Sequence, residues 1–478
     1  MKIMKKLATV LALLLLLNSC GGSATTETKE VSADTAETVV ETEDRSNVDD
    51  IPADADLGGM EFLIFTRTSV PWLNSMFDVT ETNGEAINDA IYERNRSVEG
   101  RLNTIISEEH YDDVDTRIDS VILAGDNTYD MCAITDRTAY AKIRDGYMYD
   151  TTALPYIDLS KKYWQQPIND ALSIGGKYYL LSGNYNLTTY DYTQAMLFNK
   201  KLWTDLGLDD VYTMVREGKW TFDEFQKATA AAVLDLNGDG IMDNNDQYGF
   251  GTLATSMLPN FWVAAGEHVM VKDTDGLLKY NLSGNEHFVD IINETFAITY
   301  DNNHSGILFP GNEFQDGTMF KNNQFLLYHC NFGRFPIMRD MEVDFGIIPY
   351  PKYTLEQKQY YSSNEGGKYA FVPSTHQSPA EASMVIEAIA SSSTEVFYAY
   401  YDKSLKGKST RDEESLEMLE LISDTRVLDI GRTMWQPLFV EKMARVMVEN
   451  DDRNMSSLLA SIETQILEEM KAVNDFVK

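Results

Sequence analysis

Positive charge, cysteine and histidine are all scarce in this sequence. Its 478 residues hold 40 Lys and Arg against 75 Asp and Glu, which gives a formal net charge of −35. This charge disfavours nucleic acids and anionic membrane surfaces as partners, and we expect no nucleic-acid ligand. The six histidines are scattered without the spacing of a zinc site, and there is no Gly-x-Ser-x-Gly elbow. We therefore expect a protein that is not an enzyme.

The chain has too few cysteines for a disulfide framework. Besides Cys20 it holds only Cys132 and Cys330, which lie in the apolar runs YDMCAIT and FLLYHC. Such surroundings favour buried free thiols, although a disulfide between the two stays open for an exported chain.

Long apolar runs are confined to the N-terminus. Three lysines precede an apolar run at residues 7–17, which is too short to span a bilayer and is typical of a signal-peptide core. Residues 17–20, Leu-Asn-Ser-Cys, are similar to the lipobox of bacterial lipoproteins, in which Cys20 becomes the acylated first residue. We predict a lipoprotein signal peptide at residues 1–20 and a disordered acidic tether at residues 21–56. The mature protein is then anchored to the membrane by its lipid, on the outer side.

Strand-like and helical patterns alternate in the first part of the chain. Strands are predicted at residues 60–67, 104–106 and 129–135, with helices at residues 83–101 and 114–124. This alternation is typical of parallel strands in an α/β sheet, whose ligands bind beyond the carboxyl ends of the strands. The residues expected at that edge are Thr66, Arg67 and Thr68 after the first strand, and Asp136 and Arg137 after the third.

An acidic loop at residues 235–246 has the spacing of a calcium site. If Asp235 is position 1, oxygen-bearing side chains stand at positions 1, 3, 5, 9 and 12, a glycine stands at position 6, and a backbone carbonyl is available at position 7. The alternative is a solvated turn. The predicted ligands of a structural Ca²⁺ are Asp235, Asn237, Asp239, Ile241, Asp243 and Asp246. An Asp at position 12 in place of a bidentate Glu predicts weak binding, of about 10⁻⁴–10⁻³ M.

The region around this loop carries a family resemblance. It contains Asn-Lys-Lys-Leu at residues 199–202, GKWTFDEFQKA at residues 218–228, and the acidic loop closing on DQYGFG at residues 246–251. Together these segments resemble the extracellular solute-binding proteins (family 1) of ABC importers, and the likeness extends over nearly all of the chain after the leader.

The resemblance implies an α/β, two-lobed, periplasmic-binding-protein-like fold. Its lobes are discontinuous and joined by hinge crossings, and its C-terminal region is helical. The expected lobes are residues 57–191 plus 325–374, and residues 192–324 plus 375–478. We place crossings at residues 193–199 and 314–330, and a last one after a strand predicted at residues 366–374, and we expect a monomer.

Aromatic and polar residues near the expected cleft are candidate ligand contacts. Sugar rings lie flat on aromatic faces, and their hydroxyls need fixed polar partners. Core packing is the alternative for each aromatic residue. The candidates are Trp72, Asp136, Tyr190, Trp262, Arg334 and Trp435, with Asn331 and Phe332 beside Arg334.

The resemblance implies a lipid-anchored receptor that closes two lobes on a small solute and presents it to an ABC permease. A carbohydrate, most of all an oligosaccharide, is the expected solute, held by ring stacking and neutral hydrogen bonds. Two alternatives stay open: a surface glycan-binding or sensory lipoprotein without a transport role, and a glycan-degrading lipoprotein. The second would need a pair of carboxylates across a cleft.

Overall fold

The computed structural model describes residues 45–68, 73–306, 317–407 and 410–478. The predicted signal peptide, Cys20 and most of the predicted tether lie outside the described residues. The end of that tether differs from the prediction, because residues 45–56 contact the folded part. Ile51 is buried, and the carboxylate of Asp49 accepts hydrogen bonds from Arg101 and from the hydroxyl of Ser391. No helix in the described part of the chain is long and apolar enough to cross a membrane.

The first sheet has the strand order β12-β3-β1-β2 within the described residues. Its strands are β1 (Met60–Arg67), β2 (Thr104–Tyr111), β3 (Met131–Thr135) and β12 (Lys368–Phe371). β1 pairs in parallel with β2 and β3, as the alternating pattern predicts, whereas β12 runs antiparallel to β3. The first residue of β12 therefore lies at the edge where β1 and β3 end.

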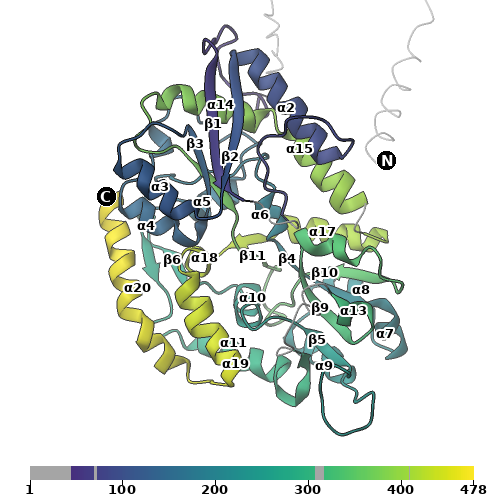
Figure 1. Cartoon of the computed structure of the whole chain (residues 1–478). Coiled ribbons are helices and arrows are strands. Elements are labelled where there is room, and N and C mark those ends of the chain that lie inside the picture. The colour runs from purple at the N-terminus through teal and green to yellow at the C-terminus, as the bar shows by residue number, and fades with distance from the viewer. Residues whose placement is uncertain (1–44, 69–72, 307–316, 408–409) are drawn as a thin grey trace, which may run out of the picture. The chain divides into compact units, whose positions relative to one another are not determined.

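Helices cover both faces of this sheet (Figure 1). Phe62 and Ile64 of β1 pack with α2 (Ala86–Leu102) and α14 (Pro379–Ser391), whereas Phe65 packs with α3 (Val114–Leu123). Successive side chains of a strand point to opposite faces, so one short run of apolar residues supports two helical layers. We expected α14 in the second lobe, but its apolar face covers the first sheet.

The second sheet has the order β10-β4-β9-β5-β8 within the described residues. Its strands are β4 (Gln194–Asn199), β5 (Tyr248–Gly251), β8 (Ser305–Gly306), β9 (Phe325–Asn331) and β10 (Phe345–Ile348). The structure corrects the predicted lobe boundary here. We assigned β9 and β10 to the first lobe, with a crossing at residues 314–330. β9 instead hydrogen-bonds to β4 on one side and β5 on the other, so it is an internal strand of the second sheet, and its side chains are buried on both faces.

Short helices surround the second sheet. They are α7 (Lys200–Asp205), α8 (Val211–Arg216), α9 (Phe222–Ala231), α10 (Met257–Ala264), α11 (Glu286–Thr299), α13 (Thr318–Lys321) and α17 (Glu413–Asp424). α9 packs on β5 and α17 packs on β10. Trp220 precedes α9 and is fully buried, and its indole N–H donates to the carbonyl of Pro349 at 3.0 Å. The core therefore accounts for this tryptophan.

Two of the segments that connect the sheets lie side by side. The first leads from α6 (Thr188–Asp191) into β4, and the second leads from β11 (Ser362–Asn364) into β12. The backbone N–H of Glu365 donates to the carbonyl of Tyr192 at 3.2 Å, and the N–H of Phe332 donates to the carbonyl of Thr193 at 3.1 Å. Both connections therefore pass through one place, where a hinge between the sheets is expected.

The C-terminal region is helical, as predicted. After α14 come α15 (Thr394–Tyr398), η5 (Ala399–Lys406), α17, α18 (Ile430–Met434), η6 (Pro437–Arg445), α19 (Val446–Asn450) and α20 (Met455–Val477). α20 packs against α4 (Ala139–Arg144) and against the small hairpin of β6 (Met270–Lys272) and β7 (Leu278–Tyr280). The remaining elements are η1 (Asp136–Thr138), η2 (Thr151–Ala153), α5 (Gln166–Leu172), η3 (Asp301–Asn303), η4 (Phe332–Met338) and β13 (Arg426–Leu428).

Candidate functional site

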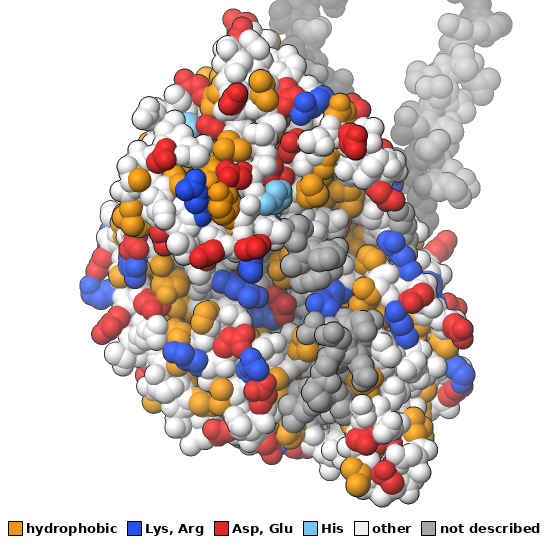
Figure 2. All heavy atoms as spheres, in the orientation of Figure 1, with side chains coloured by type: hydrophobic (Ala, Val, Ile, Leu, Met, Phe, Trp, Pro, Cys, Tyr) orange, Lys and Arg blue, Asp and Glu red, His pale blue; other side chains and the backbone are white. Residues whose placement is uncertain are grey.

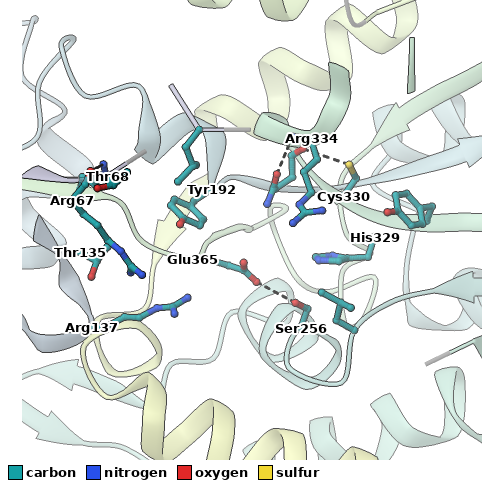
Figure 3. A pocket seen from close by; sticks show the side chains of 15 residues that line it. Arg67, Thr68, Thr135, Arg137, Tyr192, Ser256, His329, Cys330, Arg334 and Glu365 are labelled. Atoms are coloured by element: carbon teal, nitrogen blue, oxygen red, sulfur yellow. Dashed lines mark hydrogen bonds between the residues drawn. The ribbon is translucent and has the colours of Figure 1, made fainter. Parts of the chain in front are cut away.

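A cavity of about 330 Å³ lies where strand ends of the two sheets meet (Figure 3). Its described lining residues come from both sheets and from the connections between them. They are Arg67, Thr68, Leu73, Thr135, Arg137, Tyr192, Leu253, Ser256, Tyr328, His329, Cys330, Asn331, Arg334, Glu365 and Lys368. The position agrees with the rule that α/β sheets bind ligands beyond the carboxyl ends of their strands.

The first sheet contributes a cationic wall. Arg67 is the last residue of β1, and Arg137 lies two residues past the end of β3. Lys368 begins β12 and pairs in register with Thr135, the last residue of β3. One edge of a four-stranded sheet thus presents three cations to the cavity.

The second sheet contributes a mainly neutral wall. His329, Cys330 and Asn331 end β9, and Ser256 follows β5. The side chain of Asn331 accepts the backbone N–H of Arg334 at 3.1 Å and so caps η4. This cap starts the short helix from which Arg334 extends into the cavity (Figure 3).

Burial keeps the cavity histidine neutral. The Nδ1 of His329 lies 2.7 Å from the hydroxyl of Tyr350 and 3.3 Å from the side-chain nitrogen of Asn260. Removal from water disfavours the charged ring and lowers the pKa of His329 to about 4. At neutral pH this side chain is therefore a hydrogen-bonding group and not a further cation.

Two of the cations are exposed and unpaired within the described structure. The side chains of Arg67 and Arg137 are solvent-exposed, and neither forms an ion pair with a described residue. Lys368 is 3% exposed, and its ammonium donates to the backbone carbonyl of Arg67 at 2.7 Å. Burial lowers the pKa of Lys368 to about 8, with Glu108 opposing the shift.

Glu365 is the one carboxylate among the described lining residues, and it is already paired. Arg432 donates to it at 2.6 Å, and the hydroxyl of Ser256 lies 3.4 Å from it. Arg432 belongs to a smaller cavity of about 170 Å³ that shares Arg137 and Glu365 with the main one. The two cavities thus adjoin at Glu365, and its charge is balanced by a buried guanidinium.

Asp136, a predicted contact, lies behind the cavity wall. It is 2% exposed and is not among the lining residues, although Thr135 and Arg137 on either side are. Burial raises its pKa to about 6, and one carboxylate oxygen has no hydrogen-bond partner in the described structure. Gly366 covers it at φ +122°, where an added Cβ would lie 2.5 Å from the carboxylate. Glycine is required there by both space and backbone conformation.

The structure places three predicted aromatic contacts in the core and not in the cavity. Tyr190 packs on Phe397, with the guanidinium of Arg426 at 3.9 Å from its ring. Trp262 is fully buried and donates to Asp429 at 3.3 Å, and Trp435 stacks on Tyr140 and donates to Glu469 at 2.8 Å. Each indole is satisfied by a carboxylate inside the fold, which explains its burial.

Two further predicted positions have different outcomes. Arg334 lines the cavity, whereas Trp72 lies outside the described residues. Glu365 and Lys368 line the cavity but were missed. The only sequence signal for them was the strand-like segment that starts with two glycines at residues 366–367.

In the acidic loop, the side-chain oxygens cap the loop's own backbone. Asp235 accepts the N–H groups of Gly238 and Gly240, and Asp246 accepts those of Leu236 and Asp243. The hydrogen bonds that Asp235 accepts, led by the one from Gly240, lower the pKa of its carboxyl group. Among the described residues no group of three or more His, Cys, Asp or Glu side chains is arranged to hold a metal ion. Calcium binding stays a prediction.

Both remaining cysteines are buried free thiols, as predicted. Cys132 lies in β3 and Cys330 in β9, and burial raises the pKa of each thiol. They belong to different sheets, so no disulfide links the two halves through them.

The family model described as bacterial extracellular solute-binding protein matches residues 101–313. No curated protein matches this sequence. Several solved structures share the fold, and three illustrate the range.

A cyclo/maltodextrin-binding protein complexed with maltotetraose has a TM-score of 0.57 at 14% identity, covering 86% of this chain and 96% of that one. UspC of M. tuberculosis has a TM-score of 0.56 at 12% identity, covering 87% and 100%. The ABC substrate-binding protein Lmo0181 from Listeria monocytogenes, in complex with cycloalternan, has a TM-score of 0.54 at 14% identity, covering 88% and 99%. At such identities the similarity establishes the two-lobed α/β fold.

Proposed function

We propose that this chain, identified over residues 101–313 as a bacterial extracellular solute-binding protein, is the receptor of an ABC importer and binds an oligosaccharide in the cavity between its two sheets. The observation that carries the proposal is the position of this cavity. Strand ends of both sheets line it, and the two connecting segments lie next to it. A change of angle at those segments closes the two walls on a solute.

The chemistry of the lining suits a saccharide. Hydroxyl and amide groups of Thr68, Thr135, Ser256 and Asn331 line the cavity and match the edge of a sugar ring. Tyr192 and Tyr328 supply aromatic surface in place of the tryptophans that we expected. The solved proteins of similar fold complexed with maltotetraose and cycloalternan support the same class of solute.

The lining favours binding over cleavage. A glycosidase needs two carboxylates about 5–10 Å apart across its cleft. Among the described lining residues of the main cavity Glu365 is the only carboxylate, and Arg432 already holds it at 2.6 Å. A receptor that releases its solute unaltered fits this arrangement better than an enzyme does.

The anchor and the transporter complete the proposal. The Leu-Asn-Ser-Cys sequence at residues 17–20 supports acylation of Cys20 and a location on the outer side of the cell membrane. A permease partner follows from the family alone. A sensory lipoprotein with the same cavity is the second candidate, and uptake of the solute by cells that lack this protein distinguishes the two.

A binding screen of the mature protein tests the function. Melting temperatures are measured with mono- and oligosaccharides, peptides and polyamines, and every saccharide that stabilises the protein is titrated by calorimetry. We expect an oligosaccharide to raise the melting temperature and to be recovered intact after long incubation. Stabilisation by peptides or polyamines with every saccharide silent would contradict the proposal, and released sugar products would indicate an enzyme.

A further inference from the structure

The cavity has the opposite charge to the rest of the protein. Four of its described lining residues are cations and one is a carboxylate, in a chain whose formal net charge is −35. Figure 2 shows Lys and Arg side chains gathered across the middle of one face, on a surface that elsewhere shows many Asp and Glu. A concentration of cations against this background needs a reason, because isolated like charges repel one another.

Internal ion pairing does not explain the presence of Arg67 and Arg137. Arg67 and Arg137 form no ion pair with a described residue, and in Figure 3 both extend toward the middle of the cavity. The one described carboxylate of the lining, Glu365, is bound by Arg432 from the far side. Arg432 therefore balances the charge of Glu365, and this carboxylate does not neutralise Arg67 or Arg137.

The buried lysine adds to the same excess. Lys368 is 3% exposed and its ammonium donates to a backbone carbonyl, so its charge is solvated by the protein only in part. No carboxylate lies within ion-pair distance of it in the described structure. Glu108 acts on Lys368 from beyond that distance, and an anion at this end of the cavity would add opposite charge next to the lysine.

Closure around a neutral solute would be costly. It would take Arg67 and Arg137 out of water and give them only uncharged partners, and removing an unpaired charge from water is strongly unfavourable. An anionic solute restores the lost solvation through charge-assisted hydrogen bonds, and arginine binds carboxylate, sulfate and phosphate oxygens in pairs.

We propose that the solute is an anionic oligosaccharide whose carboxylate or sulfate groups are held by Arg67 and Arg137, with Arg334 and Lys368 on the flanking walls. This inference rests on the proposed function and specifies its substrate class. The hydroxyls and amides of the lining bind the sugar rings, and the cations select for the acidic groups. It differs from the expectation that ring stacking and neutral hydrogen bonds hold the solute.

Three tetrasaccharides separate the possibilities. Tetragalacturonate carries carboxylates, a chondroitin sulfate tetrasaccharide carries sulfates as well, and maltotetraose is neutral. Each is titrated by calorimetry into the mature protein at 50 and 300 mM NaCl. We expect an acidic tetrasaccharide to bind, with an affinity that falls at the higher salt concentration. If the sulfated compound binds more tightly than the carboxylated one, the acidic group that the cations recognise is a sulfate.

Arg67→Gln and Arg137→Gln, two exposed positions, test the assignment of residues. Each should weaken binding of the acidic compound about tenfold, the size of one lost charge-assisted hydrogen bond. Arg339→Gln is the matched control, because Arg339 is also exposed and unpaired in the described structure but does not line the cavity. It should leave binding unchanged.

The outcomes distinguish this inference from the function on which it rests. Binding of maltotetraose in preference to both acidic compounds, unaffected by either cavity substitution, would overturn the inference and leave the saccharide receptor standing. Loss of affinity in the control as large as in the cavity variants would also overturn it. Failure of all three saccharides to bind would overturn both.

Discussion

The two walls of the cavity differ in charge and are therefore suited to bind different groups of a solute. The wall from the first sheet carries Arg67, Arg137 and Lys368, whereas the wall from the second sheet presents His329 and other neutral polar groups, with Arg334 as the cation in its described part. One wall is suited to acidic substituents and the other to the hydroxyls of a sugar. Substitutions on the two walls should therefore have distinguishable effects.

Removal of charge from the first wall is expected to have the largest effect. The double substitution Arg67→Gln/Arg137→Gln should weaken binding of an acidic oligosaccharide about a hundredfold, because two charge-assisted hydrogen bonds are lost together. The salt dependence of the remaining affinity should also flatten. Calorimetric titration at several salt concentrations measures both quantities. If the dependence of affinity on salt concentration stays unchanged, the first wall does not carry the charge recognition that we assign to it.

Removal of a neutral group from the second wall should have a smaller and different effect. Ser256→Ala deletes a hydroxyl that lies 3.4 Å from Glu365 and lines both cavities. We expect about a fivefold loss of affinity, typical of one neutral hydrogen bond, with the salt slope kept. A flattened slope in this variant would show that charge recognition is shared by both walls.

The pH dependence of binding should report on Lys368. Its pKa is lowered to about 8, so the lysine loses its charge as the pH rises through that value. A bound anion stabilises the charged form and raises this pKa, so the complex takes up protons near pH 8. Affinity for an acidic solute should then fall about threefold between pH 7 and pH 9. Lys368→Met should remove this pH dependence, and its persistence in that variant would contradict the assignment.

Calcium should have the smallest effect and should spare the cavity. The acidic loop belongs to the second lobe, next to β5 and away from the lining residues. With a dissociation constant near 1 mM, about 5 mM calcium would add about 1 kcal/mol of stability and raise the melting temperature by about 1 °C. Solute affinity should stay the same. An identical melting temperature in calcium and in chelator would leave the loop a simple turn.

Local sequence patterns predicted a large part of the fold. The apolar runs that form β1 and β3 are continuous in the sequence. The rule that ligands bind beyond the carboxyl ends of parallel strands correctly predicted that Arg67 and Arg137 lie at the cleft. The assignment of β9 to the first lobe was wrong, because nothing in its apolar run indicates which strands lie on either side of it.

Only some of the site residues could be predicted from the sequence. Lys368 and Glu365 reach the cavity because β12 joins β3 antiparallel from far along the chain, and no local pattern encodes that pairing. Trp262 and Trp435 were misplaced for a related reason. Their indoles donate to Asp429 and Glu469, partners remote in sequence that hold both rings in the core.

Hydrogen–deuterium exchange of the mature protein, with and without a saccharide that binds it, tests the central claim most directly. The account predicts that the solute protects both walls at once, at residues 60–68 and 131–138 from the first sheet and residues 325–338 from the second, together with the connection at residues 362–368. Protection of one wall alone, or of a surface away from these segments, would contradict a cavity that closes between the two sheets.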